Sequence, residues 1–389
     1  MEWRPCSQNR DVSVLLDDFR PGLDQWLDDN AAELAPSYEG SGTLDEQVDQ
    51  INKVKRLAFD AGWMRLGWPE RVGGLGGSPL LRAYFGEALN RRDLVESGFS
   101  SFHEVLAPTM IDFAQPALAA EMVPRLLRGD ENWCQGFSEP GTGSNLAALS
   151  CRAQRVDDGW QVSGQKVWTS LAQYAHRCVL LTRTGTPESA HRGITALFVD
   201  MDSPGITVRP IGSMHGTPEF NEVFFDDVTV PMERMLGEEG QGWAVAMDLL
   251  PYERSTALWH RAAHLHLRLQ ELVDEAPPEA LDPVRLGEVV QTLYGFRARS
   301  RGTQHRFDRG VKLGPETSID KVLLAMAEQT VFDLIEEGLA AGFLLDDSPR
   351  AARWRAEYLY SRAASIYGGS AEIQRNIIAR RLLDLGTDR

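Results

Sequence analysis

The spacing of apolar residues changes twice along the chain, and this change limits the folds open to it. Up to about residue 130 the spacing is helical, as in VSVLLDDFRPGLDQWLDD. It then becomes short alternating runs such as ITVRPI and EVFFDDVTV, separated by glycine, proline, aspartate and serine, which is typical of strands and turns. From Gly242 onward helical spacing returns in long segments. We therefore expect an N-terminal helical domain (1–131), a middle β-domain (132–235) and a C-terminal helical bundle (236–389).

The length of the chain agrees with several domains, and its charge excludes some partners. A single hydrophobic core stops growing near ~250–300 residues, whereas this chain has 389. The formal charge of −16, with no run of lysine and arginine to offset it, argues against nucleic acid as a partner. No stretch approaches the ~18–20 apolar residues of a membrane span, and the first residues lack an apolar signal-peptide core. The sequence therefore predicts a cytoplasmic location.

The cysteines and histidines do not form a metal-site pattern. Cys6, Cys134, Cys151 and Cys178 stand far apart without a C-x-x-C pair, so we interpret them as reduced packing residues. Two further candidates, His264 and His266, are two positions apart in a helical pattern and point to different faces. We therefore predict no metal.

Two segments carry residues suited to a flat, ring-containing ligand. In WCQGFSEPGTGSNLA (133–147), Gly141 and Gly143 resemble the start of a dinucleotide fingerprint, but no third glycine follows and no βαβ unit is opened. A Rossmann site is therefore rejected, and the segment taken alone is typical of a glycine-rich turn. In VSGQKVWTS (162–170), an indole stands beside two hydroxyls and could pack on a ring while they serve its edge. This segment alone reads as ordinary strand packing.

Together these segments resemble the acyl-CoA dehydrogenase family. Further matches follow in the family's order: WPERVGGLGG (68–77), FNEVFFDDVTVP (220–231), LGEEGQGW (236–243) and YGGSAEIQRNIIARRLL (367–383). The resemblance implies an acyl-CoA dehydrogenase-like fold, with an N-terminal all-α domain, a middle β-barrel or sandwich domain and a C-terminal four-helix bundle. It also implies a flavoprotein oxidoreductase of lipid metabolism that uses FAD.

The motifs of this family assign residues to the cofactor. The predicted FAD-binding residues are Gln135, Phe137, Ser138, Gly143, Ser144, Trp168, Thr169, Ser170, Gly369, Ser370 and Glu372. Of these, Ser144 would also lie near the pantetheine arm of the substrate.

The catalytic base must be a carboxylate placed over the α-carbon of the thioester. Many members carry it as Tyr-Glu-Gly-Thr, but here Gly368 occupies the position of the glutamate and cannot accept a proton. A smaller branch, which includes isovaleryl-CoA and long-chain acyl-CoA dehydrogenases, carries a Glu-Arg pair on the first bundle helix. The segment LLPYERSTA matches it, so the resemblance implies Glu253 as the base and Arg254 near the substrate. The amide of Gly368 can still polarise the thioester carbonyl. The alternative is that Glu253 is only the acid of a surface ion pair.

The resemblance is incomplete in the bundle and at the substrate. The segment GFRARSRGTQHRFDRGVKLGP lacks the family's Arg-x-x-Phe-Gly motif, so the sequence leaves open whether a neighbouring subunit contacts the FAD. The missing side chain at Gly368 leaves room beside the α-carbon, which favours a branched or bulky acyl group.

Two other functions remain open at this stage. One is an acyl-CoA oxidase that passes electrons to O₂, and the other is a catalytically idle subunit that holds FAD in a mixed oligomer. For a working dehydrogenase, the resemblance implies an acyl-CoA substrate, an electron-transfer flavoprotein as acceptor, and a homotetramer or dimer, with a hetero-oligomer also open.

Overall fold

The computed structural model describes residues 12–386, so Cys6 lies outside the described residues. The chain divides into two compact units. One is Phe102–Glu253, and the other combines Met1–Ser101 with Arg254–Arg389. The division into three domains with boundaries at 131/132 and 235/236 stays a proposal.

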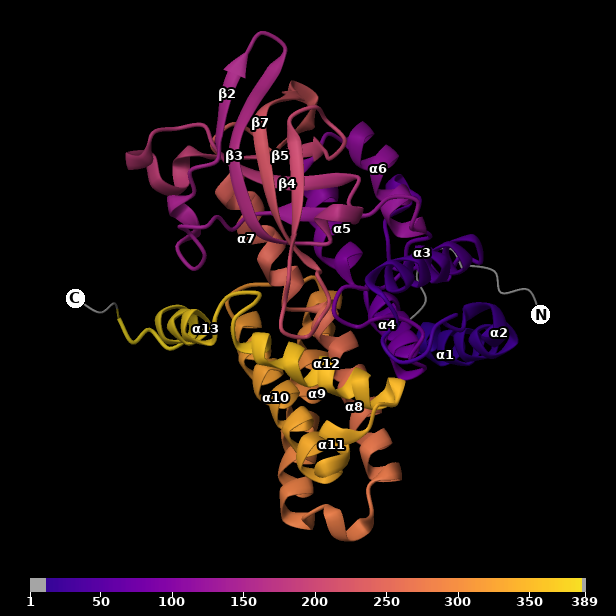
Figure 1. Cartoon of the computed structure of the whole chain (residues 1–389). Coiled ribbons are helices and arrows are strands. Elements are labelled where there is room, and N and C mark those ends of the chain that lie inside the picture. The colour runs from indigo at the N-terminus through magenta and orange to yellow at the C-terminus, as the bar shows by residue number, and fades with distance from the viewer. Residues whose placement is uncertain (1–11, 387–389) are drawn as a thin grey trace. The chain divides into compact units, whose positions relative to one another are not determined.

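Four long helices form the predicted bundle. They are α8 (Thr256–Glu275), α9 (Pro283–Asp308), α10 (Thr317–Leu339) and α12 (Pro349–Ser361), with the short α11 (Ala341–Leu345) before the last (Figure 1). Helix α8 packs on α9 and α10, and α10 packs on α12. Their apolar faces meet in one core that includes Leu265, Leu272, Leu293, Phe296, Leu324, Val331, Ile335 and Trp354. The four-helix bundle is confirmed.

The starts of two bundle helices follow from local sequence. Asp282 accepts a hydrogen bond from the Val284 amide at the start of α9, and Ser348 accepts one from the Ala351 amide at the start of α12. In both cases proline is the first helical residue, where no backbone N–H is needed.

The N-terminal helices belong to the same unit as the bundle. They are α1 (Val12–Asp29), α2 (Ala31–Leu34), α3 (Leu44–Asp60) and α4 (Leu80–Arg91). Helix α4 packs on α8 at Gly86, where a β-carbon would lie 2.0 Å from Nε2 of His260. Ser101 holds the other ring nitrogen of that histidine at 2.7 Å. Glycine at 86 thus permits the close approach of the two helices.

The other unit contains the predicted β-domain. Its strands are β1 (Trp133–Gly136), β2 (Arg152–Val156), β3 (Gly159–Ser170), β4 (Arg177–Arg183), β5 (Ile194–Asp200), β6 (Ile206–Ile211), β7 (Phe220–Pro231) and β8 (Met235–Leu236). They form one mixed sheet in the order β6-β7-β3-β2-β4-β5-β8, and β1 pairs with β4 off this path. Helices α5 (Phe102–Phe113), α6 (Pro116–Arg128) and α7 (Gly242–Glu253) complete the unit.

The sheet curls around its own core. Strand β1 contacts β3, and β5 contacts β7, although neither pair is hydrogen-bonded. Such contacts arise when a twisted sheet folds over and packs its inner face on itself. The enclosed side chains include Trp160, Val162, Leu180, Leu197, Val223, Phe225 and Val228. A middle domain of barrel or sandwich type is therefore confirmed.

The three described cysteines lie in this core. Cys134, Cys151 and Cys178 are all buried and not disulfide-bonded, which confirms that they pack as reduced side chains. Burial raises the pKa of the Cys151 thiol to about 11, so it stays protonated at neutral pH.

Two further findings concern the predictions of location and metal binding. Within residues 12–386, no helix is long and apolar enough to cross a membrane. Across the same part of the chain, no group of three His, Cys, Asp or Glu side chains is arranged to hold a metal ion. As expected, His264 and His266 face different partners, Glu357 and Tyr294.

A buried network of charges ties α8 to α12. Arg268, which is 2% exposed, donates to Glu357 at 3.0 Å and to Asp93 at 2.8 Å. His264 lies 3.2 Å from the same glutamate. Burial alone would raise the pKa of the Glu357 carboxyl, but Arg268 and His264 outweigh burial and hold the pKa well below its usual range.

The depressed pKa of Glu357 predicts acid sensitivity. A carboxylate whose folded pKa lies below its unfolded value (~4.3) stabilises the protein above that value and loses this effect as the pH falls. In urea unfolding followed by circular dichroism, Glu357→Gln should lose about 3–5 kcal/mol at neutral pH, because Arg268 keeps a buried, under-compensated charge. The variant should also lose less additional stability than the natural protein on acidification.

Glu121→Gln is the matched control. Glu121 forms an exposed ion pair with Arg125, with side chains 56% and 44% exposed, so its loss should change stability by less than about 1 kcal/mol. Equal midpoints for Glu357→Gln and Glu121→Gln would contradict the prediction.

Candidate functional site

The glycine-rich segment after β1 forms a loop with a fixed base and an open tip. Phe137 is buried at the base, and the Ser138 carbonyl accepts a hydrogen bond from the Val167 amide at 2.9 Å. At the tip, Gly143 and Ser144 are exposed, and a β-carbon at Gly143 would meet nothing within 4 Å. The loop therefore offers backbone that a ligand can approach closely.

A buried ion pair joins this loop to strand β3. Lys166 is fully buried, and its Nζ lies 2.8 Å from Oε1 of Glu139, which is 5% exposed. The lysine also donates to the Phe137 carbonyl at 3.2 Å. The glutamate accepts further hydrogen bonds from the amides of Ser150 and Cys151 at 2.7 and 2.8 Å. Burial would raise the pKa of Glu139, but Lys166 and these amides outweigh it and lower the pKa, which favours the ionised carboxylate.

The ion pair was not among the predicted site residues. Glu139 and Lys166 are the charged residues inside the two segments interpreted as ligand-binding, where the other residues are small, polar or apolar. That signal is visible in the sequence, since a charge in such a context is retained only if it is paired. Their pairing holds the two segments together.

Trp168 is held outward by an irregularity in β3. The register with β7 shifts between Lys166 and Thr169, and Trp168 lies at the shift with φ of +60°. Its indole is 58% exposed and packs edge-on against Phe220 at 6.0 Å between ring centroids. A positive φ at a bulky residue costs about 1–3 kcal/mol and is common at functional sites. The strain turns a large aromatic side chain away from the core.

The residues beside Trp168 fit a flavin ring. Thr169 is 1% exposed, and its Oγ1 has no hydrogen-bond partner among the described residues. A buried hydroxyl in this state needs a partner, which the edge of a bound ring can supply. Ser170 follows at the end of the strand, partly exposed. An exposed indole, an unsatisfied hydroxyl and an open glycine loop in one unit suit a flat cofactor with polar edges.

Asn221 holds the irregularity in place. It is fully buried in β7, and its Nδ2 donates to the Thr169 carbonyl at 3.1 Å and to the Glu219 carbonyl at 3.3 Å. It also donates to the side chain of Gln173. Asn221 was not predicted from the sequence, because asparagine at the start of a strand is too common to indicate a role.

The predicted base is the last residue of helix α7. Glu253 is half-buried there, in the Phe102–Glu253 unit. The next residue, Arg254, begins the other unit and is 8% exposed. Its Nε donates to the Gly368 carbonyl at 3.0 Å. The structure thus brings together two predicted substrate residues, Arg254 and Gly368.

The turn at Gly368 and Gly369 needs both glycines. Their φ angles are +63° and +90°, in the region that side chains disfavour. A β-carbon at Gly369 would lie 2.4 Å from Nε2 of Gln374, which donates to the carbonyls of both glycines at 3.3–3.4 Å. The turn is therefore held by hydrogen bonds to its backbone.

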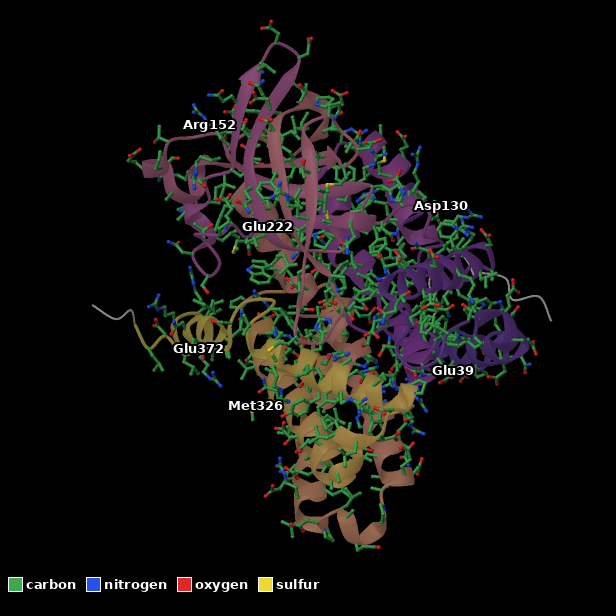
Figure 2. All side chains as sticks on the ribbon, in the orientation of Figure 1. Glu39, Asp130, Arg152, Glu222, Met326 and Glu372 are labelled. Carbon is green, nitrogen blue, oxygen red and sulfur yellow. The ribbon has the colours of Figure 1, made fainter. Side chains whose placement is uncertain are left out.

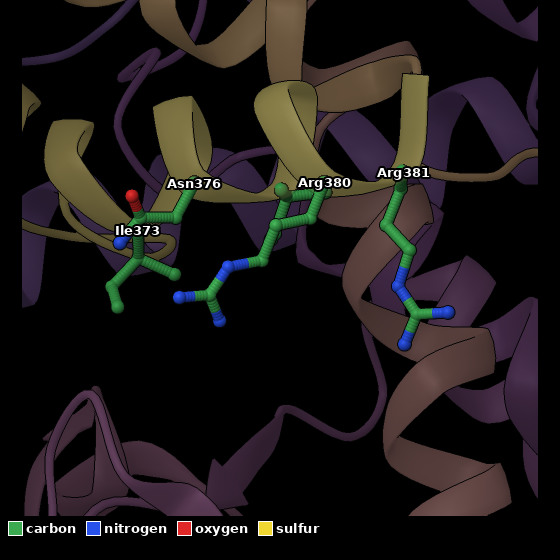
Figure 3. Close-up of a pocket in the computed structure, with 5 residues that line it drawn as sticks. Ile373, Asn376, Arg380 and Arg381 are labelled. Atoms are coloured by element: carbon green, nitrogen blue, oxygen red, sulfur yellow. The ribbon is translucent and has the colours of Figure 1, made fainter. Parts of the chain in front are cut away.

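The remaining predicted residues open the last helix. Ser370 caps α13 (Ala371–Ile377) by accepting a hydrogen bond from the Ile373 amide, and Glu372 is exposed in its first turn (Figure 2). Figure 3 shows Ile373, Asn376, Arg380 and Arg381 pointing to the same side of this helix and the π-helical turn that follows it. With Ile377 they line a pocket of about 250 Å³.

Comparison with known proteins identifies the chain. The acyl-CoA dehydrogenase N-terminal domain matches residues 17–130, the middle domain 134–228 and the C-terminal domain 240–383. These three matched domains define a flavin-dependent oxidoreductase. The chain belongs to the acyl-CoA dehydrogenase family. Its cofactor is FAD, and it dehydrogenates acyl-CoA thioesters.

Three relatives illustrate the similarity. Acyl-CoA dehydrogenase IpdE1 of Mycobacterium tuberculosis is 36% identical over 95% of this chain and 98% of its own length. Mitochondrial isovaleryl-CoA dehydrogenase of Oryza sativa is 26% identical over 95% of this chain and 92% of its own. A chain in the crystal structure of the ChsE4-ChsE5 complex of Mycobacterium tuberculosis has a TM-score of 0.77 and 26% identity, covering 98% of this chain and 99% of that one.

The buried ion pair predicts that FAD retention depends on Lys166. Lys166→Met leaves Glu139 buried without its cation, which costs about 3–5 kcal/mol and loosens the loop. We expect the flavin absorbance per protein after purification to fall at least about tenfold, while the far-ultraviolet circular dichroism is kept.

Two further variants serve as controls for this prediction. Arg155→Met removes a long cation from the neighbouring strand β2, where its ion pair with Glu239 is exposed, and should retain flavin. The double variant Glu139→Gln/Lys166→Met buries no charge and should recover part of the flavin content. Full flavin content in Lys166→Met would show that the pair is not needed.

Proposed function

We propose that this acyl-CoA dehydrogenase uses Glu253 as its catalytic base. The observation that carries the proposal is the turn at Gly368. Glycine has no side chain to accept a proton, and the φ of +63° at this position disfavours any residue that has one. Arg254, the residue that follows Glu253, hydrogen-bonds the carbonyl of this same glycine. A carboxylate at 253 therefore adjoins the arginine that holds the turn.

The proposed mechanism divides the work among a few residues. Glu253 takes the proton from the α-carbon of the acyl thioester, and a double bond forms between the α- and β-carbons as the β-hydride leaves. When bound, FAD supplies the acceptor for this hydride at its N5. The Gly368 amide donates to the thioester carbonyl oxygen, where negative charge develops as the proton leaves. Arg254 keeps that turn in position.

The proposed cofactor residues act by holding the flavin. Trp168 would pack on the ring, and the hydroxyls of Thr169 and Ser170 would bind its polar edge. The open loop contributes backbone and side chains through Gln135, Phe137, Ser138, Gly143 and Ser144, and the start of α13 contributes Gly369, Ser370 and Glu372. Ser144 also approaches the pantetheine arm.

We infer a branched or bulky acyl group as substrate. Glycine at 368 leaves space where a side chain would otherwise stand beside the α-carbon. The rice relative is named for isovaleryl-CoA, a branched thioester, which supports this inference.

The proposed partners follow from the family and from one neighbour. We infer an electron-transfer flavoprotein as the acceptor and an assembly of two or four chains. The structural neighbour from the ChsE4-ChsE5 complex is described as part of a complex of two proteins, which supports a mixed oligomer beside a homo-oligomer. A cytoplasmic location also stays a prediction.

Glu253→Gln should separate binding from chemistry. The variant keeps the size and polarity of the side chain but cannot take a proton, so we expect unchanged FAD content and acyl-CoA affinity. The rate of anaerobic flavin bleaching by a saturated acyl-CoA should fall by about 10³–10⁴. Glu233→Gln, which alters an exposed glutamate of the same unit, should bleach at the natural rate. A nearly normal rate for Glu253→Gln would rule out this base.

Glycine at 368 should set the preference for branched substrates. We expect kcat/KM for isovaleryl-CoA to exceed that for straight-chain butyryl-CoA by about tenfold, and Gly368→Ala to reduce this ratio because a methyl group occupies the added space. The measurement is steady-state turnover with an artificial electron acceptor. A profile confined to short straight chains would contradict the inference.

A further inference from the structure

A second buried ion pair lies in the helical bundle and has no part in the mechanism above. Arg261 on α8 donates to Glu328 on α10 through Nε at 3.1 Å and through a terminal nitrogen at 2.8 Å. The arginine is 5% exposed and the glutamate fully buried. A bidentate ion pair of this kind fixes both side chains in one geometry, although burying it yields little net stability. Its position suggests another use.

The pair holds the ring of Tyr367. The Tyr367 hydroxyl donates to Oε2 of Glu328 at 3.3 Å, so the carboxylate binds arginine and tyrosine together. From another side, the Nζ of Lys321 lies 4.0 Å from the centre of the tyrosine ring, and this lysine is 3% exposed. The same ammonium donates to the Ala364 carbonyl. Tyr367 is thus bound at its hydroxyl and at its face by charged groups on α10.

The residue after Tyr367 is held separately. The carbonyl of Gly368 accepts hydrogen bonds from Arg254 at 3.0 Å and from Gln374 at 3.4 Å. The Gly368 amide belongs to the peptide group between these two anchors. Two consecutive glycines, Gly368 and Gly369, leave the turn no side chains of its own, so its orientation depends on the anchors at either end.

We propose that Tyr367, anchored by Glu328 and Lys321, is a positioning residue that aims the Gly368 amide at the thioester carbonyl oxygen. This inference rests on the proposed function, in which that amide stabilises the charge formed when Glu253 takes the α-proton. A donor helps only if it points to where the negative charge develops, so a small rotation of the peptide group weakens it. The bundle thereby controls the acidity of the α-proton through one tyrosine.

The test isolates proton removal from hydride transfer. In (isopropylthio)acetyl-CoA a sulfur replaces the β-carbon, so the enzyme can remove the α-proton to Glu253 but no β-hydride can leave. The enolate then stays beside oxidised flavin and gives a long-wavelength charge-transfer absorption. The pH at which half of the bound thioester is enolate measures how well the carbonyl oxygen is stabilised.

Tyr367→Phe removes only the hydroxyl that binds Glu328. We expect enolate formation to become about tenfold less favourable, which moves the half-formation pH up by about one unit. With isovaleryl-CoA, kcat should fall by a similar factor, while KM, FAD content and thermal midpoint stay nearly unchanged. Tyr294→Phe changes a ring that is 58% exposed on α9 and should leave the half-formation pH unchanged. An unchanged half-formation pH in Tyr367→Phe overturns the proposal.

Glu328→Gln tests the same anchor from its other side, because Glu328 accepts the hydrogen bond of the Tyr367 hydroxyl. Its amide oxygen can still accept from Tyr367, but the charge that fixes the group against Arg261 is lost, so the shift should be in the same direction and smaller. Glu337→Gln on the same helix, whose pair with Arg285 is exposed, is the matched control. A shift in Glu337→Gln equal to that in Glu328→Gln would overturn the proposal.

The same assay distinguishes this inference from the function on which it rests. If the unaltered enzyme forms the enolate and Glu253→Gln does not, the base is supported, and an unaffected Tyr367→Phe then overturns the positioning role alone. If the unaltered enzyme forms no enolate, or Glu253→Gln forms it as readily, the proposed function fails and the positioning role fails with it.

Discussion

The buried pair between Lys166 and Glu139 is the interaction on which the loop of the proposed flavin site depends. It joins a glycine-rich loop, which has few apolar side chains to bury, to a strand of the curled sheet. One carboxylate gathers the lysine and two loop amides, so the loop acquires a fixed base while its tip stays open. Such a loop would otherwise lose too much conformational entropy to be held in one shape.

The bundle side uses the same device for a different purpose. Arg254 and Gln374 hold the backbone of a turn of two glycines, and Arg261 with Glu328 holds the tyrosine before it. In both units, buried polar and charged side chains fix backbone that carries no side chain for the purpose. A charge removed from water is strongly constrained to its partner, and this constraint is useful where a backbone N–H must be aimed.

Much of the fold could be predicted, and less of the site. Helical and alternating spacing predicted the helix-sheet-helix order, and the four-helix bundle, the curled sheet and the buried cysteines are confirmed. The assignment of the glycine loop and Trp168 to the cofactor came from the motifs of the family and stays a proposal. Glu139, Lys166 and Asn221 were missed. The sequence shows the two charges inside these segments, but the fold decides that they pair with each other and which carbonyls Asn221 binds. Glu253 as the base stays a proposal.

By itself, the sequence determined the class of fold, the family and the absence of a carboxylate side chain at position 368. Periodicity, motif order and the identity of a residue are local properties. Only the tertiary structure decided which charges pair, that a shifted register turns Trp168 outward, and that Arg254 donates a hydrogen bond to the Gly368 carbonyl. These features depend on distances between residues far apart in the chain. The spacing of residues along the sequence does not predict such distances, because burial and pairing are properties of the packed molecule.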